Sequence, residues 1–171
     1  IKYIMNNIDS EIKKIEIISE NEKNKILYKF NETNMNYLKD KTIVQLFEEQ
    51  AEKTPNNIAV VFENKKITYK ELNEKANQLA HFLRGKKIMP NEIVGIMLPR
   101  SIELISTIIG TLKAGACYIP IDPSYPEQRI KYMLENSDAK ILLTDDELLK
   151  NIEYKDKISV NFETSEIYKL D

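Results

Sequence analysis

Four short apolar runs constrain the fold of this 171-residue chain more than any other feature of its sequence. In chain order they span residues 58–62, 93–98, 116–121 and 141–143. Apolar and polar residues do not alternate within these runs, as they would in a strand with one face in water. We therefore expect β-strands that are covered on both faces.

A second recurrent pattern predicts where helices begin. A Ser or Thr followed three residues later by Glu or Gln can form a capping box, in which each side chain binds the other residue's free backbone amide. The spacing occurs at Ser19–Glu22, Thr42–Gln45, Thr68–Glu71, Ser124–Glu127 and Thr144–Glu147. Each of these pairs predicts a helix start.

Two of the expected helices also have predictable ends. Residues 69–84 carry one apolar stripe, and we expect Gly85 to end this helix. The stripe consists of Leu72, Ala76, Leu79 and Leu83. Residues 101–114 are apolar around most of the helix surface, and we expect Gly115 to follow them in a left-handed conformation.

The order of these elements predicts the fold class. Strands and helices alternate with short connections, which is typical of an α/β fold with a parallel sheet, right-handed crossovers and flanking helices. A turn at residues 63–65 can add a small hairpin. With 42% hydrophobic residues, the chain can form one core, and we assign residues 35–171 to this domain. Residues 1–34 contain no glycine and are rich in Ile, Glu, Lys and Asn, so we expect a linker or the tail of another domain, with a helix from Ser19 to about Phe30.

Charge and cysteine content exclude several classes of protein. Lys and Arg number 25 and Asp and Glu 27, without a basic cluster, so we expect neither a nucleic-acid partner nor a membrane partner. Apolar stretches are much shorter than the roughly 18 residues that span a bilayer, and residues 1–30 contain no signal-peptide core. The single cysteine, Cys117, excludes an internal disulfide and a thiolate metal cluster, and the cytoplasm is the expected location.

The expected carboxyl end of the strand at 116–121 holds the first candidates for ligand contact. Residues 122–126 contain two prolines and suit a rigid corner between a strand and a helix, although Asp122 or Tyr125 could also contact a ligand. Arg100 follows the strand at 93–98, where it could bind an anion or pair with a carboxylate of the same fold.

Other candidates for chemistry give no site. His81 is expected on the polar side of its helix, and Cys117 is expected to be a small apolar side chain inside a buried strand. The four glycines form neither of the two common phosphate-binding loops. We therefore predict no catalytic residue, no cofactor-binding residue and no metal ligand in this chain.

Two segments resemble core motifs of the adenylation domains of nonribosomal peptide synthetases, which belong to the adenylate-forming superfamily. Residues 68–84 resemble the first motif, with Ile67 where leucine is usual. Residues 112–122 resemble the second, with Cys117 where a small residue such as alanine is usual. Residues 18–33 resemble the end of a condensation domain and its linker. The resemblance covers nearly the whole chain but only about the first third of an adenylation domain.

The resemblance implies an activity for a complete adenylation domain, and it also implies that the segment present here is inactive by itself. A complete adenylation domain uses ATP and Mg²⁺ to activate an amino acid and then loads it on the phosphopantetheine thiol of a carrier domain. In the family the phosphate loop, the ribose-binding aspartate and the catalytic lysine all follow the two motifs found here. We therefore expect an inactive fragment whose partners are the rest of the adenylation domain and the condensation and carrier domains, and which could self-associate. The alternative is a stand-alone scaffold or docking module derived from the same fold.

Overall fold

The computed structural model describes residue 11 and residues 18–36 and 39–169, and the chain divides into two units, residues 1–40 and 41–171. In the first unit, α2 (Glu20–Leu27) is followed by the short η2 (Lys29–Asn31). Ser19 and Glu22 form the predicted capping box at the start of α2. None of the residues of α2 or η2 is buried within the unit.

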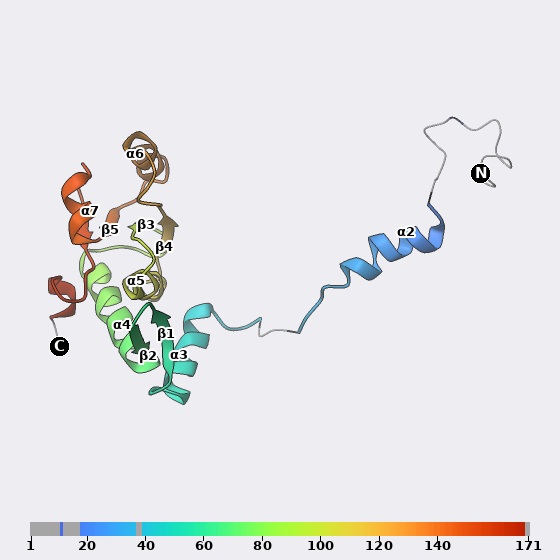
Figure 1. Ribbon diagram of the computed structural model, residues 1–171, viewed down its shortest axis with the longest axis horizontal. Coiled ribbons are helices and arrows are strands. Elements are labelled where there is room, and N and C mark those ends of the chain that lie inside the picture. Colours follow the sequence, from blue (N-terminus) through green and yellow to red (C-terminus); the bar gives the residue numbers. More distant parts are fainter. Residues whose placement is uncertain (1–10, 12–17, 37–38, 170–171) are drawn as a thin grey trace. The chain divides into compact units, whose positions relative to one another are not determined.

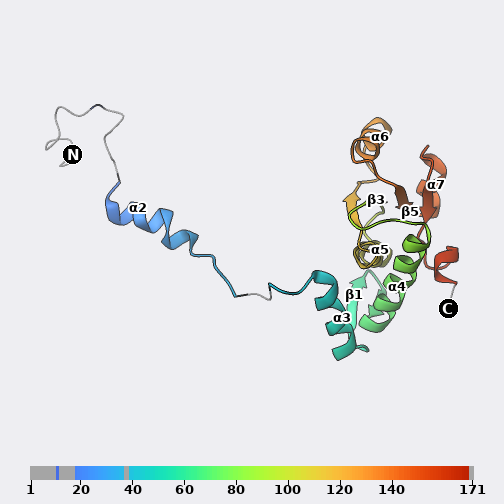
Figure 2. The ribbon, with the colours of Figure 1, turned by 180° about the vertical axis from the view of Figure 1, so that it is seen from behind.

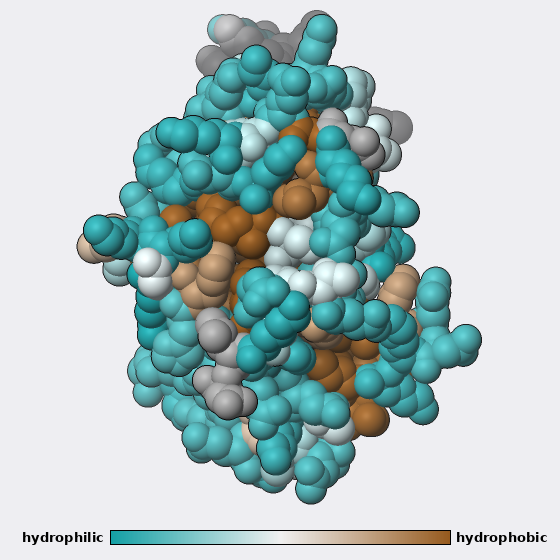
Figure 3. All heavy atoms as spheres, turned by 90° about the vertical axis from the view of Figure 1, so that its left-hand side faces the viewer, coloured by the Kyte–Doolittle hydropathy of each residue, from teal (hydrophilic) through white to brown (hydrophobic). Residues whose placement is uncertain are grey.

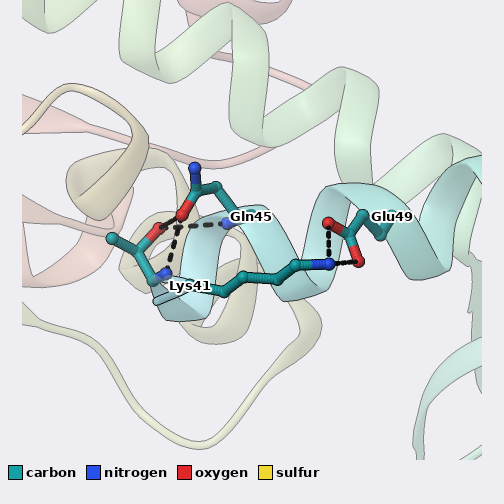
Figure 4. A network of polar contacts seen from close by, with 4 residues as sticks. Lys41, Gln45 and Glu49 are labelled. Atoms are coloured by element: carbon teal, nitrogen blue, oxygen red, sulfur yellow. Dashed lines mark hydrogen bonds and ion pairs between the residues drawn. The ribbon is translucent and has the colours of Figure 1, made fainter. Parts of the chain in front are cut away.

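The second unit begins with α3 (Ile43–Lys53), whose start is fixed by side chains on its own first turns. Thr42 and Gln45 form the predicted capping box, and the ammonium group of Lys41 lies 2.7 Å from a carboxylate oxygen of Glu49 (Figure 4). The ion pair reaches across two turns on the exposed side of the helix, so its contribution to stability is small.

The first apolar run forms a hairpin and not a strand of the parallel sheet. Strand β1 (Ile58–Phe62) pairs in antiparallel register with β2 (Lys65–Thr68) across a tight turn at Glu63, which has a φ of 53°. Val60 and Phe62 pack inward, whereas Val61 is 58% exposed. The expectation that this run is covered on both faces was therefore wrong, because a hairpin on the outside of the fold has a solvent face.

After the hairpin, helices and strands alternate along the chain. They are α4 (Tyr69–Gly85), β3 (Ile93–Met97), α5 (Ile102–Lys113), β4 (Cys117–Pro120), α6 (Glu127–Asn136), β5 (Ile141–Thr144), α7 (Asp146–Asn151), β6 (Lys157–Ser159) and η3 (Glu166–Tyr168). The strands β4, β3, β5 and β6 form one sheet in that order, with parallel pairing throughout. This arrangement confirms the predicted α/β fold class; β6 was not predicted.

The two faces of the parallel sheet are covered by different helices (Figures 1 and 2). Crossovers between parallel strands are right-handed, so the step from β3 to β4 and the return step from β4 to β5 place their helices on opposite faces. Side chains from α4 and α5 pack with Val94, Ile96 and Leu143 on one face. Side chains from α6 and α7 pack with Met97 and Leu142 on the other.

Strand burial follows position in the sheet. The central strands β3 and β5 are almost completely buried, as predicted. By contrast, β4 is an edge strand that pairs only with β3 among the described residues, and Cys117 is exposed at its start. The prediction of Cys117 as a buried side chain was wrong, because apolar composition does not reveal which strand lies at the edge of a sheet.

Two of the predicted helix starts have a different cap. The N-cap of α6 is Pro126, without a side-chain hydrogen bond, so Ser124 does not cap this helix. The N-cap of α7 is Asp145, and the hydroxyl of Thr144 instead donates to the carbonyl of Met97. At the start of α7, the carboxylate of Asp145 therefore caps the helix in place of the predicted hydroxyl of Thr144, which lies one residue earlier.

Helices α4, α5 and α6 end in the same way, with one residue in the left-handed region. At the end of α5 this residue is Gly115, with a φ of 87°, which confirms the prediction. At the end of α4 it is Lys87, with a φ of 62°, and Gly85 is the last helical residue, which confirms that Gly85 ends this helix. Asp138 has this role after α6. In each case an amide beyond the left-handed residue binds a carbonyl in the last turn, as in a Schellman motif.

Candidate functional site

The strand order creates a crevice at the carboxyl edge of the sheet. The chain leaves β3 toward β4 on one side and then returns to β5 on the other side of β3. In open α/β sheets, ligands bind outside the carboxyl ends of the strands where the strand order reverses. A cavity of about 200 Å³ lies there, lined by Leu98, Pro99, Ser101, Glu103, Asp145 and Asn161. A larger hollow beside α2 is the open surface of a single exposed helix.

The polar residues of the crevice already hold the loops that surround it. The hydroxyl oxygen of Ser101 accepts a hydrogen bond from the amide of Leu104 at the start of α5. One carboxylate oxygen of Asp145 accepts two amides at the start of α7, at 3.0 and 2.8 Å. The side-chain oxygen of Asn161 accepts the amide of Glu163 at 2.8 Å. These three side chains therefore fix the loops that form the walls of the crevice.

Asp122 and Arg100 lie at neighbouring strand ends on the other side of β3. The carboxylate of Asp122 accepts the amide of Ser124 at 2.8 Å, which closes the corner after β4. Hydrogen bonds from Ser124 and the nearby positive charge of Arg100 lower the pKa of the Asp122 carboxyl below its ordinary value. Pairing of Arg100 with a carboxylate and binding of an anion by Arg100 both remain predictions.

Tyr125 is held by a neighbouring side chain within the same corner. The guanidinium carbon of Arg129 lies 4.0 Å from the centre of the Tyr125 ring, a cation–π arrangement. Together with Asp122 and the two prolines, this contact makes residues 122–130 a braced connection between β4 and α6. Ligand contact by Asp122 or Tyr125 remains a prediction.

The other residues considered from the sequence lie outside the crevice. His81 is exposed on α4, as predicted. Gly85, Gly95 and Gly110 lie within α4, β3 and α5, and Gly115 ends α5. None of these four glycines forms a loop before a helix, and the absence of a cofactor-binding residue from this chain remains a prediction. Nor does the described part of the chain bring together three or more His, Cys, Asp or Glu side chains that could hold a metal ion.

A buried lysine that the sequence reasoning missed links three helices. The side chain of Lys113, at the end of α5, is only 4% exposed. Its ammonium group donates to the carboxylate of Glu48 on α3 and, at 2.8 Å, to the side-chain oxygen of Asn77 on α4. A lysine in an otherwise apolar helix was the available signal. The contacts indicate a structural role, because buried charges are paired and hydrogen-bonded.

Comparison with known proteins places this arrangement in context. Residues 47–169 match the family model described as AMP-binding enzyme. Over 166 residues the chain is 47% identical to bacitracin synthase 3 of Bacillus licheniformis, an alignment that covers 95% of the chain and 3% of that protein. Over 152 residues it is 49% identical to gramicidin S synthase 2 of Brevibacillus brevis, covering 89% of the chain and again 3% of the relative. The chain thus spans a small part of the length of these relatives.

Solved structures show the same fold. The nonribosomal peptide synthetase FmoA3 in its AMPPNP-bound form matches with a TM-score of 0.74 and 26% identity, covering 84% of this chain and 16% of that one. The N-terminal subdomain of NpsA from Klebsiella oxytoca matches with a TM-score of 0.64 and 30% identity, covering 70% of this chain and 31% of that one. None of the helices in the described ranges is long and apolar enough to cross a membrane.

Proposed function

The chain belongs to the family of AMP-binding enzymes, and from this premise we propose that it supplies part of an amino-acid-activating adenylation domain in a nonribosomal peptide synthetase. In the complete domain, a carboxylate oxygen of the amino acid attacks the α-phosphate of ATP and pyrophosphate leaves. The aminoacyl group then passes to the phosphopantetheine thiol of a carrier domain, and AMP leaves. The observation that carries the proposal is the 47% identity to bacitracin synthase 3 over nearly the whole chain.

The part supplied by this chain is a scaffold. The first motif segment forms α4, whose stripe of Leu72, Leu79 and Leu83 is buried in the core. The second motif segment forms the end of α5 and the edge strand β4. These side chains position the sheet and its carboxyl edge, and the groups that bind ATP, Mg²⁺ and the amino acid are contributed by the rest of the adenylation domain. The polypeptide alone is therefore inactive in adenylation.

The partners follow from the same proposal. Residues 1–34 connect a condensation domain to the adenylation domain, and the division of the structure into two units after Asp40 supports a linker in this region. A carrier domain receives the product. The synthetase acts in the cytoplasm, where a free thiol such as that of Cys117 stays reduced.

A segment exchange tests the proposal. Residues 41–169 would replace the matching segment of gramicidin S synthase 2, and amino-acid-dependent exchange of labelled pyrophosphate into ATP would be measured. We expect the chimera to retain exchange with the recipient's own amino acid, whereas the isolated chain shows none with any common amino acid.

A matched control uses the contact between α4 and α5. A side chain at Gly110 would come within 2.9 Å of the carbonyl oxygen of Ala76, so Gly110→Val should separate these helices and abolish exchange in the chimera. A chimera that is folded by circular dichroism yet inactive would contradict the proposal and favour a stand-alone scaffold or docking module.

A further inference from the structure

Helix α3 buries few side chains against the rest of the second unit. Of its 11 residues only Ala51 is buried, and Ile43 and Leu46 near its start are 74% and 40% exposed. Helices α4 and α5, by comparison, each bury several residues. Segments with few buried apolar contacts open locally at a lower free energy than the core. The attachment of α3 therefore depends strongly on its other contacts.

Lys113 supplies a polar contact that joins α3 to both of its neighbouring helices. Its ammonium group donates to the carboxylate of Glu48 and lies 5.8 Å from the centre of the Phe47 ring, so it contacts two consecutive residues of α3. The same group donates to the side-chain oxygen of Asn77 on α4 at 2.8 Å. The Lys113 side chain is 4% exposed, whereas that of Glu48 is 45% exposed. The lysine is thus fixed in the core, and the carboxylate reaches it from the surface.

The two ends of α3 are connected differently. Beyond its C-terminal end, the carbonyls of Pro55 and Asn57 accept the amides of Lys70 and Tyr69 at 2.9 and 3.0 Å, which fixes this segment to the start of α4. At its N-terminal end, the capping box and the ion pair shown in Figure 4 are internal to residues 41–49. The helix is therefore tied at its C-terminal end, and the contact with Lys113 lies near its middle.

We propose that the contact between Lys113 and Glu48 is a latch, and that α3 detaches from α4 and α5 as a unit, up to residues 54–57, when this contact opens. Opening exposes the ammonium group of Lys113 to water, so its charge is not left buried without the carboxylate. An isolated helix of 11 residues is marginally stable in water, so a detached α3 also loses its helical hydrogen bonds. The parallel sheet stays intact.

The latch sets the length of chain between the two units. Helix α3 is the first element after the division at Asp40. Its 11 residues span about 17 Å as a helix and up to about 36 Å when extended. In the synthetase proposed above, detachment would lengthen the connection to the condensation domain by up to roughly 20 Å. Because the contacts involved lie within the second unit, the latch is present whether or not the chain takes part in amino-acid activation.

Residue-resolved hydrogen exchange of the full chain tests the latch with two matched variants. Glu48→Ala removes the carboxylate that Lys113 binds. Glu49→Ala is the control, because the same change at the next residue removes only the exposed ion pair with Lys41. We expect the amides of residues 46–54 to exchange about tenfold faster than in the wild type in Glu48→Ala, and at the wild-type rate in Glu49→Ala.

Amides outside α3 show where the opening stops. We expect the amides of Tyr69 and Lys70 and those of the central strand β3 to keep their wild-type exchange rates in Glu48→Ala, because their hydrogen bonds stay closed. Unchanged exchange of α3 in Glu48→Ala, or an equal increase in Glu49→Ala, would show that the contact with Lys113 does not hold the helix. An increase that extends to Tyr69, Lys70 or β3 would show that α3 does not open alone. Each of these results would overturn the proposal.

Discussion

Lys87 and Gly85 occupy positions that suit each other's residue type. Lys87 adopts a left-handed backbone conformation after α4, which costs a residue with a β-carbon roughly 1 kcal/mol. Gly85 lies in the helix, where a methyl group would meet no other atom within 4 Å. Two effects therefore lower the stability of the fold at this helix end. One is the backbone strain at Lys87, and the other is the conformational entropy that Gly85 loses on folding.

Substitutions at these positions should stabilise the fold. We expect Gly85→Ala to raise the free energy of unfolding by about 0.5–1 kcal/mol and Lys87→Gly by up to about 1 kcal/mol, measured by urea denaturation. Gly115→Val is the control, because the φ of 87° at Gly115 is strained for valine and should lower the free energy of unfolding by about 1 kcal/mol or more. Equal urea midpoints for all three variants would show that left-handed strain does not govern these helix ends.

Among the helices and strands, features that depend on neighbouring residues were predicted from the sequence, and features that depend on contacts between distant segments were not. Capping boxes at Thr42 and Thr68 were predicted because all their atoms lie within one helical turn. Strand β6 was missed because its three residues include Lys157 and Ser159, and it exists only through pairing with β5. Composition gave no sign that β4 lies at the edge, since its position depends on the strand order.

The crevice could not be predicted for the same reason. Its lining comes from Ser101, Asp145 and Asn161, which follow three different strands, and only the order β4, β3, β5, β6 brings them together. The sequence did indicate that strand ends would carry polar residues, as at Asp122. For Lys113 the sequence showed a lysine in a mainly apolar helix, but it did not show that Glu48 and Asn77 on two other helices would be its partners.

The capping boxes of α3 and α4 offer a test of pH dependence between matched elements. Gln45 closes the box on α3, and Glu71 closes it on α4, where its carboxylate accepts the amide and hydroxyl of Thr68 at 2.8 Å. These bonds lower the pKa of Glu71 below its ordinary value of 4.5. Because the pKa is lower in the folded state, the carboxylate stabilises the fold at neutral pH, and this contribution is lost as the pH falls through the folded-state pKa.

Exchanging the two box residues should exchange this behaviour. We expect Glu71→Gln to reduce the loss of stability between pH 7 and pH 3, and Gln45→Glu to increase it. Urea midpoints at the two pH values provide the measurement. A wild-type acid response in Glu71→Gln would mean that other carboxylates control acid stability.

At the scale of the whole molecule, the described second unit leaves apolar surface uncovered. Ile43 on α3 is 74% exposed, and Tyr118 on the edge strand β4 is 38% exposed. Strand β6 lies at the opposite end of the sheet from β4, so the segment that follows it does not cover this edge. Another face, shown in Figure 3, is mainly hydrophilic, with apolar residues gathered in two places. Uncovered strand edges and apolar patches favour association.

The chain in isolation should therefore self-associate at micromolar concentration through β4 or the hairpin. Reburial of about 400 Å² of apolar surface would contribute on the order of 10 kcal/mol, against a cost of lost translational and rotational freedom of roughly 4–15 kcal/mol. Sedimentation velocity over a concentration series measures the association, and a dye that reports apolar surface measures the exposure. Tyr118→Lys places a charge on the strand edge and Val61→Lys places one on the hairpin, and both positions are exposed enough to preserve folding. The variant that weakens association identifies the surface involved, and a wild-type chain that stays monomeric without binding dye would show that neither surface is adhesive.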